Sequence, residues 1–103
     1  MNSIVTDKLP QVAQICRKYR VVTMYLFGSV TTGTFNEKSD IDVMVSFGDV
    51  ESLEYFDNLI SFKQALEKLF ARSVDLLEES AIRNPVLRRS IERNKQLVYG
   101  RTD

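Results

Sequence analysis

Apolar residues in the first part of the chain repeat at helical spacing and then form a continuous run. In residues 6–19 they recur every three or four positions, which is typical of a helix with one buried face. They are Leu9, Val12, Ile15, Cys16 and Tyr19. We expect Thr6 or Asp7 to cap this helix and Pro10 to lie in its first turn. The run 21–27 is β-branched and aromatic and stops at a glycine, so it predicts a buried strand.

Polar and apolar residues alternate strictly in the next predicted strand, residues 40–47. One face carries Ile41, Val43, Val45 and Phe47. The other face carries Asp40, Asp42, Met44 and Ser46. Residues 31–39 before it are polar and predict a loop.

The second half of the chain predicts two helices and two short strands. A helix of about 15–20 residues comes first. Its buried stripe is expected to hold Leu53, Phe56, Leu59, Ile60, Leu66, Leu69 and Phe70. A strand over 73–77, a helix from Asn84-Pro85 to residue 93, and a strand over 96–99 complete the pattern.

This order of elements predicts one domain over residues 1–103. Its class is α/β (α+β), with helices packed on a small mixed sheet of about four strands. The aromatic side chains Phe47, Tyr55 and Phe56 are expected to belong to its core rather than to an interface.

Composition excludes several classes of function. The 103 residues hold 14 Lys+Arg and 14 Asp+Glu, and this zero net charge gives no overall attraction to nucleic acid or to a membrane surface. The absence of histidine excludes Ser-His-Asp and Cys-His catalysis and His-zinc sites. Cys16 is the single cysteine, expected to be a buried thiol, which fits a cytoplasmic protein. No apolar run approaches the ~20 residues that span a bilayer, and no signal pattern opens the chain.

The candidate chemistry lies in Gly28-Ser29 and in Asp40 and Asp42, with ten residues between Ser29 and Asp40. A helical turn beginning at Gly28-Ser29 would direct free backbone amides and a hydroxyl at one spot, which suits a phosphate. Asp40 and Asp42 are two apart on a strand, so they project from the same face about 6.5–7 Å apart. Oxygen-only ligands of this kind favour Mg²⁺.

A third carboxylate is expected from the next strand, where Asp75 lies between Val74 and Leu76. A phosphate site beside a metal site is what transfer of a nucleotide from a nucleoside triphosphate requires. Asp75 could be a further metal ligand or accept the proton of the attacking hydroxyl.

These residues carry a resemblance to a known family. Gly-Ser, about ten residues and then Asp-x-Asp resembles the hallmark of the polymerase-β-like nucleotidyltransferase superfamily. The short length resembles its minimal nucleotidyltransferases, and the chain is similar to MntA-type antitoxins, which pair with HEPN-type toxins. The resemblance implies that Gly28 and Ser29 hold the triphosphate and that Asp40, Asp42 and Asp75 form the magnesium-binding catalytic centre.

By the same resemblance, the donor is ATP and the acceptor is a tyrosine of a HEPN-type toxin, which AMP transfer would silence. The chain departs from the family at Thr32, where many members carry an arginine. Thr32 offers no charge to a phosphate, although Lys38 or a C-terminal arginine could compensate. A degenerate member that neutralises its partner by binding alone is therefore the alternative hypothesis.

Charge is unevenly distributed, which leaves further alternatives open. Residues 37–57 hold seven acids against one base, and residues 83–101 hold six bases against one acid. The basic residues are Arg83, Arg88, Arg89, Arg93, Lys95 and Arg101. They could meet phosphates or an acidic partner, or form a solvated helix face. Asp40, Asp42 and Asp75 could likewise be ordinary solvated acids, Ser29 could be only a helix cap, and a homo-oligomer is possible.

Overall fold

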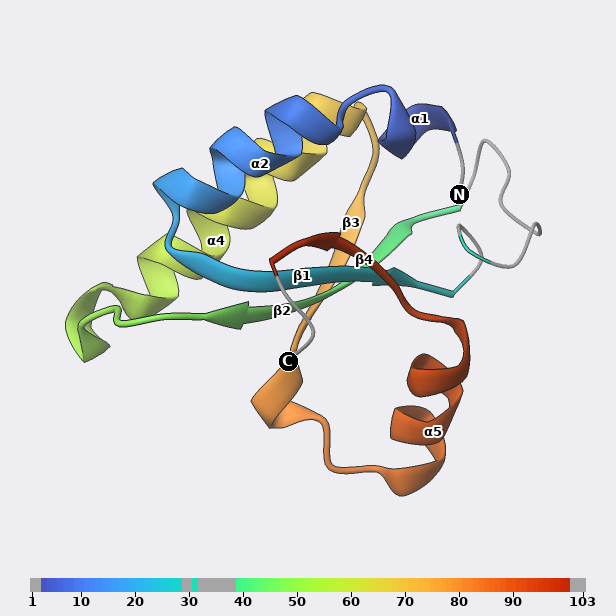
Figure 1. Cartoon of the computed structure of the whole chain (residues 1–103). Coiled ribbons are helices and arrows are strands. Elements are labelled where there is room, and N and C mark those ends of the chain that lie inside the picture. The colour runs from blue at the N-terminus through green and yellow to red at the C-terminus, as the bar shows by residue number, and fades with distance from the viewer. Residues whose placement is uncertain (1–2, 29–30, 32–38, 101–103) are drawn as a thin grey trace.

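The structure, a computed structural model, describes residues 3–28, 31 and 39–100. It contains every helix and strand that the sequence predicts (Figure 1). In chain order the elements are α1 (Ser3–Thr6), α2 (Leu9–Lys18), β1 (Val21–Phe27), β2 (Ile41–Phe47), α4 (Ser52–Phe70), β3 (Val74–Glu78), the short 3-10 helix η1 (Glu79–Ala81), α5 (Pro85–Asn94) and β4 (Gln96–Tyr99).

The four strands form one mixed sheet in the order β3-β2-β1-β4. β1 is antiparallel to both β2 and β4, whereas β2 and β3 are parallel. The parallel pair requires a crossover, and α4 supplies it. The predicted four-stranded mixed sheet with packed helices is thus confirmed.

Both faces of the sheet are buried, each by different helices. α2 and α4 cover one face, and α5 lies on the opposite side (Figure 1). The larger core, beneath α2 and α4, includes Leu26, Val43 and Phe62. The smaller core consists of Tyr25, Phe27, Met44, Ile82 and Ile91. The alternation predicted for β2 is confirmed, since Val43 belongs to the larger core and Met44 to the smaller.

The helix predicted over residues 6–19 is α2, and a further short helix that the sequence did not predict, α1, precedes it. The backbone amide of Lys8 donates to the Val5 carbonyl at 2.9 Å, in the turn between α1 and α2. Lys8 is the N-cap residue of α2 and makes no side-chain cap, so the prediction of a Thr6 or Asp7 cap is wrong. The Lys8 ammonium instead donates to the Leu69 carbonyl at 2.9 Å, which ties α2 to the end of α4.

Cys16 is fully buried on α2, as predicted, with its Sγ 3.8 Å from the Met24 sulfur. Burial raises the pKa of this thiol to about 12, so it stays protonated and inert.

The first turns of α4 depart from the predicted buried stripe. Leu53 is 95% exposed, Phe56 67% and Ile60 36%, so placing these three side chains in the core is wrong. The 19-residue helix is about 28 Å long, and its buried side chains Phe62, Leu66 and Phe70 all lie in its second half. In its first half, Tyr55 contacts Phe47 of β2 and Glu78 of β3. Within the part of the chain that the structure describes, no helix combines the length and apolar content needed to cross a membrane.

Candidate functional site

Three strand ends meet at one end of the sheet and carry Gly28, Asp42 and Asp75, with Asp40 directly before β2. β1 ends at Phe27 and Gly28, β2 begins directly after Asp40, and β3 begins at Val74. Because β1 is antiparallel to β2 and β3 is parallel to it, the end of β1 and the starts of β2 and β3 share this end of the sheet.

Asp42 lies at the centre of this arrangement. Its Cα is paired with Phe27 on β1 and with Asp75 on β3. Paired residues of neighbouring strands project from the same face, so the Asp42 and Asp75 carboxylates lie on the same side of the sheet. This is the face of the smaller core, which also carries Phe27 and Met44. We call it the site face.

Gly28 lies directly against Asp42. Its φ of +72° is in the left-handed region that glycine adopts without strain. A Cβ at this position would overlap Asp42 Oδ2 and lie 3.1 Å from Cγ. The absence of a side chain here is therefore what leaves room for the Asp42 carboxylate.

The surroundings of Asp42 destabilise its ionised form. Burial raises the pKa of Asp42 above its usual value, and the like charges of Asp75 and then Asp40 raise it further. The charges of Asp75 and Asp40 both act on Asp42, and the shared role of the three acids remains a prediction. We call Asp40, Asp42 and Asp75 the acidic cluster. A cation bound there would relieve this repulsion.

Thr31 is hydrogen-bonded to Gly28. The backbone amide and Oγ1 of Thr31 both donate to the Gly28 carbonyl, at 3.1 Å and 2.9 Å. Thr31 is thus tied to Gly28, the residue that lies against Asp42, a contact that the sequence did not predict. Ser29 and Thr32 lie outside the described residues, so the phosphate-binding role of Ser29 remains a prediction.

Two side chains at the end of α4 hold the starts of β2 and β3. Glu67 Oε2 accepts a hydrogen bond from the Val74 amide at 3.0 Å, and Val74 directly precedes Asp75. Arg72 Nη1 donates to the Ser39 carbonyl at 3.1 Å, and Ser39 directly precedes Asp40. Sequence analysis missed both, because neither bond follows from a local pattern.

The cations that could compensate for Thr32 are only partly described. Lys38 and Arg101 lie outside the described residues. Lys95 lies on the site face, with its Nζ 4.5 Å from the centre of the Tyr25 ring and 2.9 Å from Glu92 Oε2. Its hydrogen bond to Glu92 raises the pKa of Lys95, so the ammonium is charged at neutral pH.

The donor chemistry of the acidic cluster fits Mg²⁺, which typically takes one or two protein carboxylates together with water and substrate phosphates. Asp42 and Asp75, paired across two strands, could be such carboxylates. Over residues 3–28, 31 and 39–100, no group of three or more His, Cys, Asp or Glu side chains is arranged to hold a metal ion. A centre with all three carboxylates as ligands therefore remains a prediction.

Comparison with known proteins connects this geometry to a family. Residues 9–98 match the family model described as a nucleotidyltransferase domain. A Methanocaldococcus jannaschii protein described as a candidate protein adenylyltransferase, MJ1379, is 39% identical over 82 residues, 80% of this chain and 79% of its own. Protein adenylyltransferase MntA of Thermococcus cleftensis is 28% identical over 86 residues, 84% of this chain and 81% of its own.

Solved structures share the fold. One, described as a candidate minimal nucleotidyltransferase, has a TM-score of 0.73 and 29% identity, covering 89% of this chain and 90% of its own. A toxin–antitoxin structure with AMP-PNP has a TM-score of 0.68 and 23% identity, covering 90% and 73%. A structure of a tri-AMPylated Shewanella oneidensis HEPN toxin with its MNT antitoxin has a TM-score of 0.64 and 19% identity, covering 93% and 72%.

The match therefore extends over nearly the whole sheet and the helices on it, and it includes the strand ends that carry Gly28, Asp42 and Asp75. The fold is that of the minimal nucleotidyltransferases. The chain belongs to the nucleotidyltransferase domain family.

Proposed function

We propose that this nucleotidyltransferase transfers AMP from ATP, with Mg²⁺, to a tyrosine hydroxyl of a HEPN-type toxin and so acts as its antitoxin. The observation that carries the proposal is the placement of Asp42 between Gly28 and Asp75, on one face and at one end of the sheet. The relative named protein adenylyltransferase MntA supports AMP as the transferred group. The structure of an AMPylated HEPN toxin with an MNT antitoxin supports the class of acceptor.

Each residue has a defined role in this proposal. Asp40 and Asp42 would hold Mg²⁺, with Asp75 as a further ligand or as the base. Gly28 and Ser29 would hold the β- and γ-phosphates, because their backbone can approach an anion closely. When bound, the metal would supply positive charge that neutralises the phosphates and the departing pyrophosphate.

The reaction balances without any further reactant. The tyrosine oxygen forms a bond to the α-phosphorus, and the bond from that phosphorus to the bridging oxygen of pyrophosphate breaks. The hydroxyl proton passes to the Asp75 carboxylate and from there to solvent. Asp75 is exposed, so it can exchange that proton with water.

The test is labelling of a purified HEPN-type toxin, encoded beside this chain, with ATP that carries the label at either the α- or the γ-phosphate. AMP transfer labels the toxin from α-labelled ATP only. Asp42→Asn and Asp75→Asn should abolish the label, whereas Asp57→Asn, on an exposed turn of α4, should not. Absence of label with the wild-type chain, or equal loss with Asp57→Asn, would contradict the proposal.

Thr32 supports a second candidate, an antitoxin that binds its toxin without modifying it. A neutral residue stands there in place of a phosphate-binding arginine. Calorimetry separates the two functions. Tight toxin binding with no heat on titration of MgATP favours the binding function, and saturable binding of MgATP favours the enzyme.

A further inference from the structure

α5 is unusual in how little of it is buried. Ile91 is the only buried residue of this ten-residue helix, and the other nine are exposed. Two of the exposed side chains are apolar: Val86 is 67% exposed and Leu87 40%. A helix of a small domain normally buries a broad apolar stripe, so α5 presents a surface that its own chain leaves uncovered.

The exposed surface of α5 is strongly basic. Residues 83–95 hold five basic residues against Glu92, which already pairs with Lys95. Arg88 donates to the Glu79 carbonyl at 3.2 Å and Arg89 to the Pro85 carbonyl at 3.4 Å. Neither bond neutralises a charge, and within the described part of the chain no arginine of α5 forms an ion pair.

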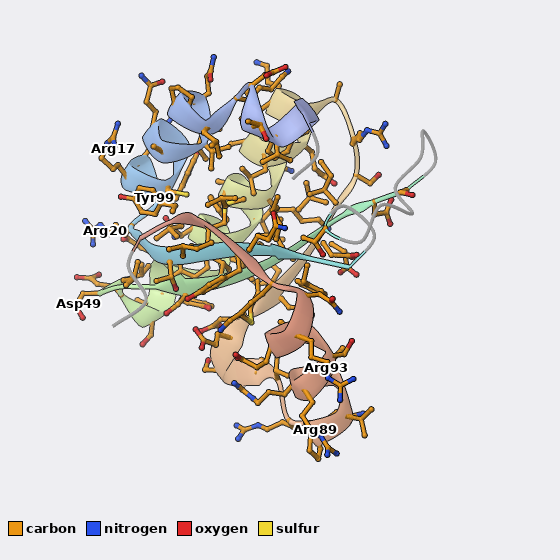
Figure 2. All side chains as sticks on the ribbon, turned by 45° about the vertical axis from the view of Figure 1, so that its right-hand side comes forward. Arg17, Arg20, Asp49, Arg89, Arg93 and Tyr99 are labelled. Carbon is orange, nitrogen blue, oxygen red and sulfur yellow. The ribbon has the colours of Figure 1, made fainter. Side chains whose placement is uncertain are left out.

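Apolar and basic residues share one side of the helix. Val86, Arg89 and Arg93 follow one another at three- and four-residue spacing, so they form a single column along α5. Figure 2 shows Arg89 and Arg93 on the opposite side of the sheet from Arg17, which belongs to α2. We call Val86, Arg89 and Arg93 the basic column.

α5 lies on the same side of the sheet as the acidic cluster, with Ile91 toward the sheet and Arg89 and Arg93, roughly 160° around the helix from Ile91, toward solvent. Ile91 packs with Phe27 and Met44 on the site face, beside Asp42. The chain then leaves α5 directly into β4, where Gln96 pairs with Leu26, the residue before Phe27. α2 and α4 cover the other face, so α5 is the long helix on the same side of the sheet as Asp42 and Asp75 (Figure 1).

We propose that α5 is the docking element for the acceptor protein, and that the acceptor presents acidic and apolar side chains to the basic column. The inference rests on the proposed function, because it assigns the surface through which that acceptor is held. Charge complementarity identifies the partner as acidic, and the exposed Val86 and Leu87 favour a protein over a nucleic acid, whose backbone offers no apolar contact.

The test measures binding without nucleotide, using a fluorescent random copolymer of glutamate and tyrosine as the probe. The double variant Arg89→Glu, Arg93→Glu should weaken its binding about tenfold or more at low salt. The matched control Arg17→Glu, Lys18→Glu makes the same charge change on exposed residues of α2 and should leave binding within about twofold. Circular dichroism and thermal melts check that both variants are folded.

Further measurements distinguish the other classes of molecule that could bind α5. Binding of the lysine–tyrosine copolymer or of poly(A) RNA more tightly than the acidic copolymer would overturn the proposal, as would equal affinities for the two double variants. A concentration-dependent dimer that only the α5 variant dissociates would assign the surface to a second copy and would also overturn it. Val86→Ser should weaken the binding that remains at high salt, where ionic contacts are screened.

Failure of the proposed transfer reaction and failure of the proposed docking surface give different results. If the wild-type chain binds the acidic copolymer through α5 but transfers no AMP to any acceptor, the transfer reaction is wrong and the docking surface stands. If AMP transfer occurs with the same KM for the acceptor in both double variants, the docking surface is wrong and the transfer reaction stands. With both correct, the α5 variant raises the acceptor KM and leaves kcat unchanged.

Discussion

Replacement of Gly28 by alanine tests the site geometry most directly. A non-glycine residue in the left-handed region costs about 1–2 kcal/mol, and Gly28 has a φ of +72°. The new methyl group would also overlap Asp42 Oδ2. That oxygen is the end of a side chain and can rotate away, so the overlap adds little to the loss of stability. The overlap displaces the Asp42 carboxylate by on the order of 1 Å. A displacement of this size can lower the rate of a reaction that depends on exact positioning about 10²-fold.

Gly100 provides a matched control. Its φ is +96°, and an added Cβ would overlap the carbonyl oxygen of Val22, which is backbone and cannot rotate away. Gly100→Ala should therefore destabilise the fold more than Gly28→Ala but leave AMP transfer by the folded protein intact. Gly48→Ala places its Cβ 3.3 Å from Val22 Cγ2 at an exposed turn and should change both quantities little.

The assay measures thermal stability and AMP transfer for all three variants. Gly28→Ala should lower Tm by about 4–8 °C for each kcal/mol lost, and its transfer should fall about a hundredfold at a temperature where the variant is fully folded. If Gly28→Ala and Gly100→Ala lose activity only in proportion to their loss of stability, Gly28 is not needed to place the Asp42 carboxylate, and the reasoning is refuted.

Three further predictions concern charge, helix capping and the support of β3. Asp42→Asn should raise the free energy of unfolding above pH 3.8 and abolish transfer. Because the pKa of Asp42 is raised, the wild-type free energy of unfolding falls as pH rises from 3.8 through that pKa. Urea melts across pH 3–7 should therefore show the variant's gain in free energy of unfolding increasing with pH and then levelling off. A gain that is the same at every pH would contradict this. Asn84→Ala removes the cap of α5 and should cost about 1 kcal/mol in the same melts, whereas an unchanged midpoint would show that α5 adds nothing to global stability. Glu67→Ala should lower the free energy of unfolding by about 1–2 kcal/mol and also lower AMP transfer, because the Val74 amide loses its acceptor. Glu67→Gln keeps an oxygen in place and should restore both stability and transfer. Equal losses in the two variants would refute the role of this bond.

The elements that sequence analysis predicted correctly are those whose cause is local. The alternation over residues 40–47 admits one strand register, so the opposite orientations of Val43 and Met44 followed from a period of two. The start of α5 followed from Asn84, whose Oδ1 accepts from the Val86 amide at 2.9 Å. Asp40, Asp42 and Asp75 could be grouped because Asp42 and Asp75 lie on consecutive strands and Asp40 directly precedes the first of these strands.

The features that sequence analysis missed depend on tertiary placement. The 3.6-residue period shows that one side of α4 is apolar but not which of its turns are buried, so Leu53 and Phe56 were wrongly placed in the core. The bonds from Glu67 to Val74 and from Arg72 to Ser39 join the end of α4 to strand starts, and no spacing rule predicts them.

The position of Asp42 destabilises the folded protein when no ligand is bound. A domain selected for stability alone would not place a carboxylate half-buried against a glycine, with two like charges acting on it, since each of these raises the free energy of the folded state. Glu67 and Arg72 hydrogen-bond the backbone directly before Asp75 and Asp40 and so help to fix the start of each segment. A ligand that carries positive charge would recover this energy on binding. The apo protein is therefore expected to gain more stability from Mg²⁺ with ATP than the Asp42→Asn variant, whose folded state holds no such strain, and equal gains would place the nucleotide elsewhere.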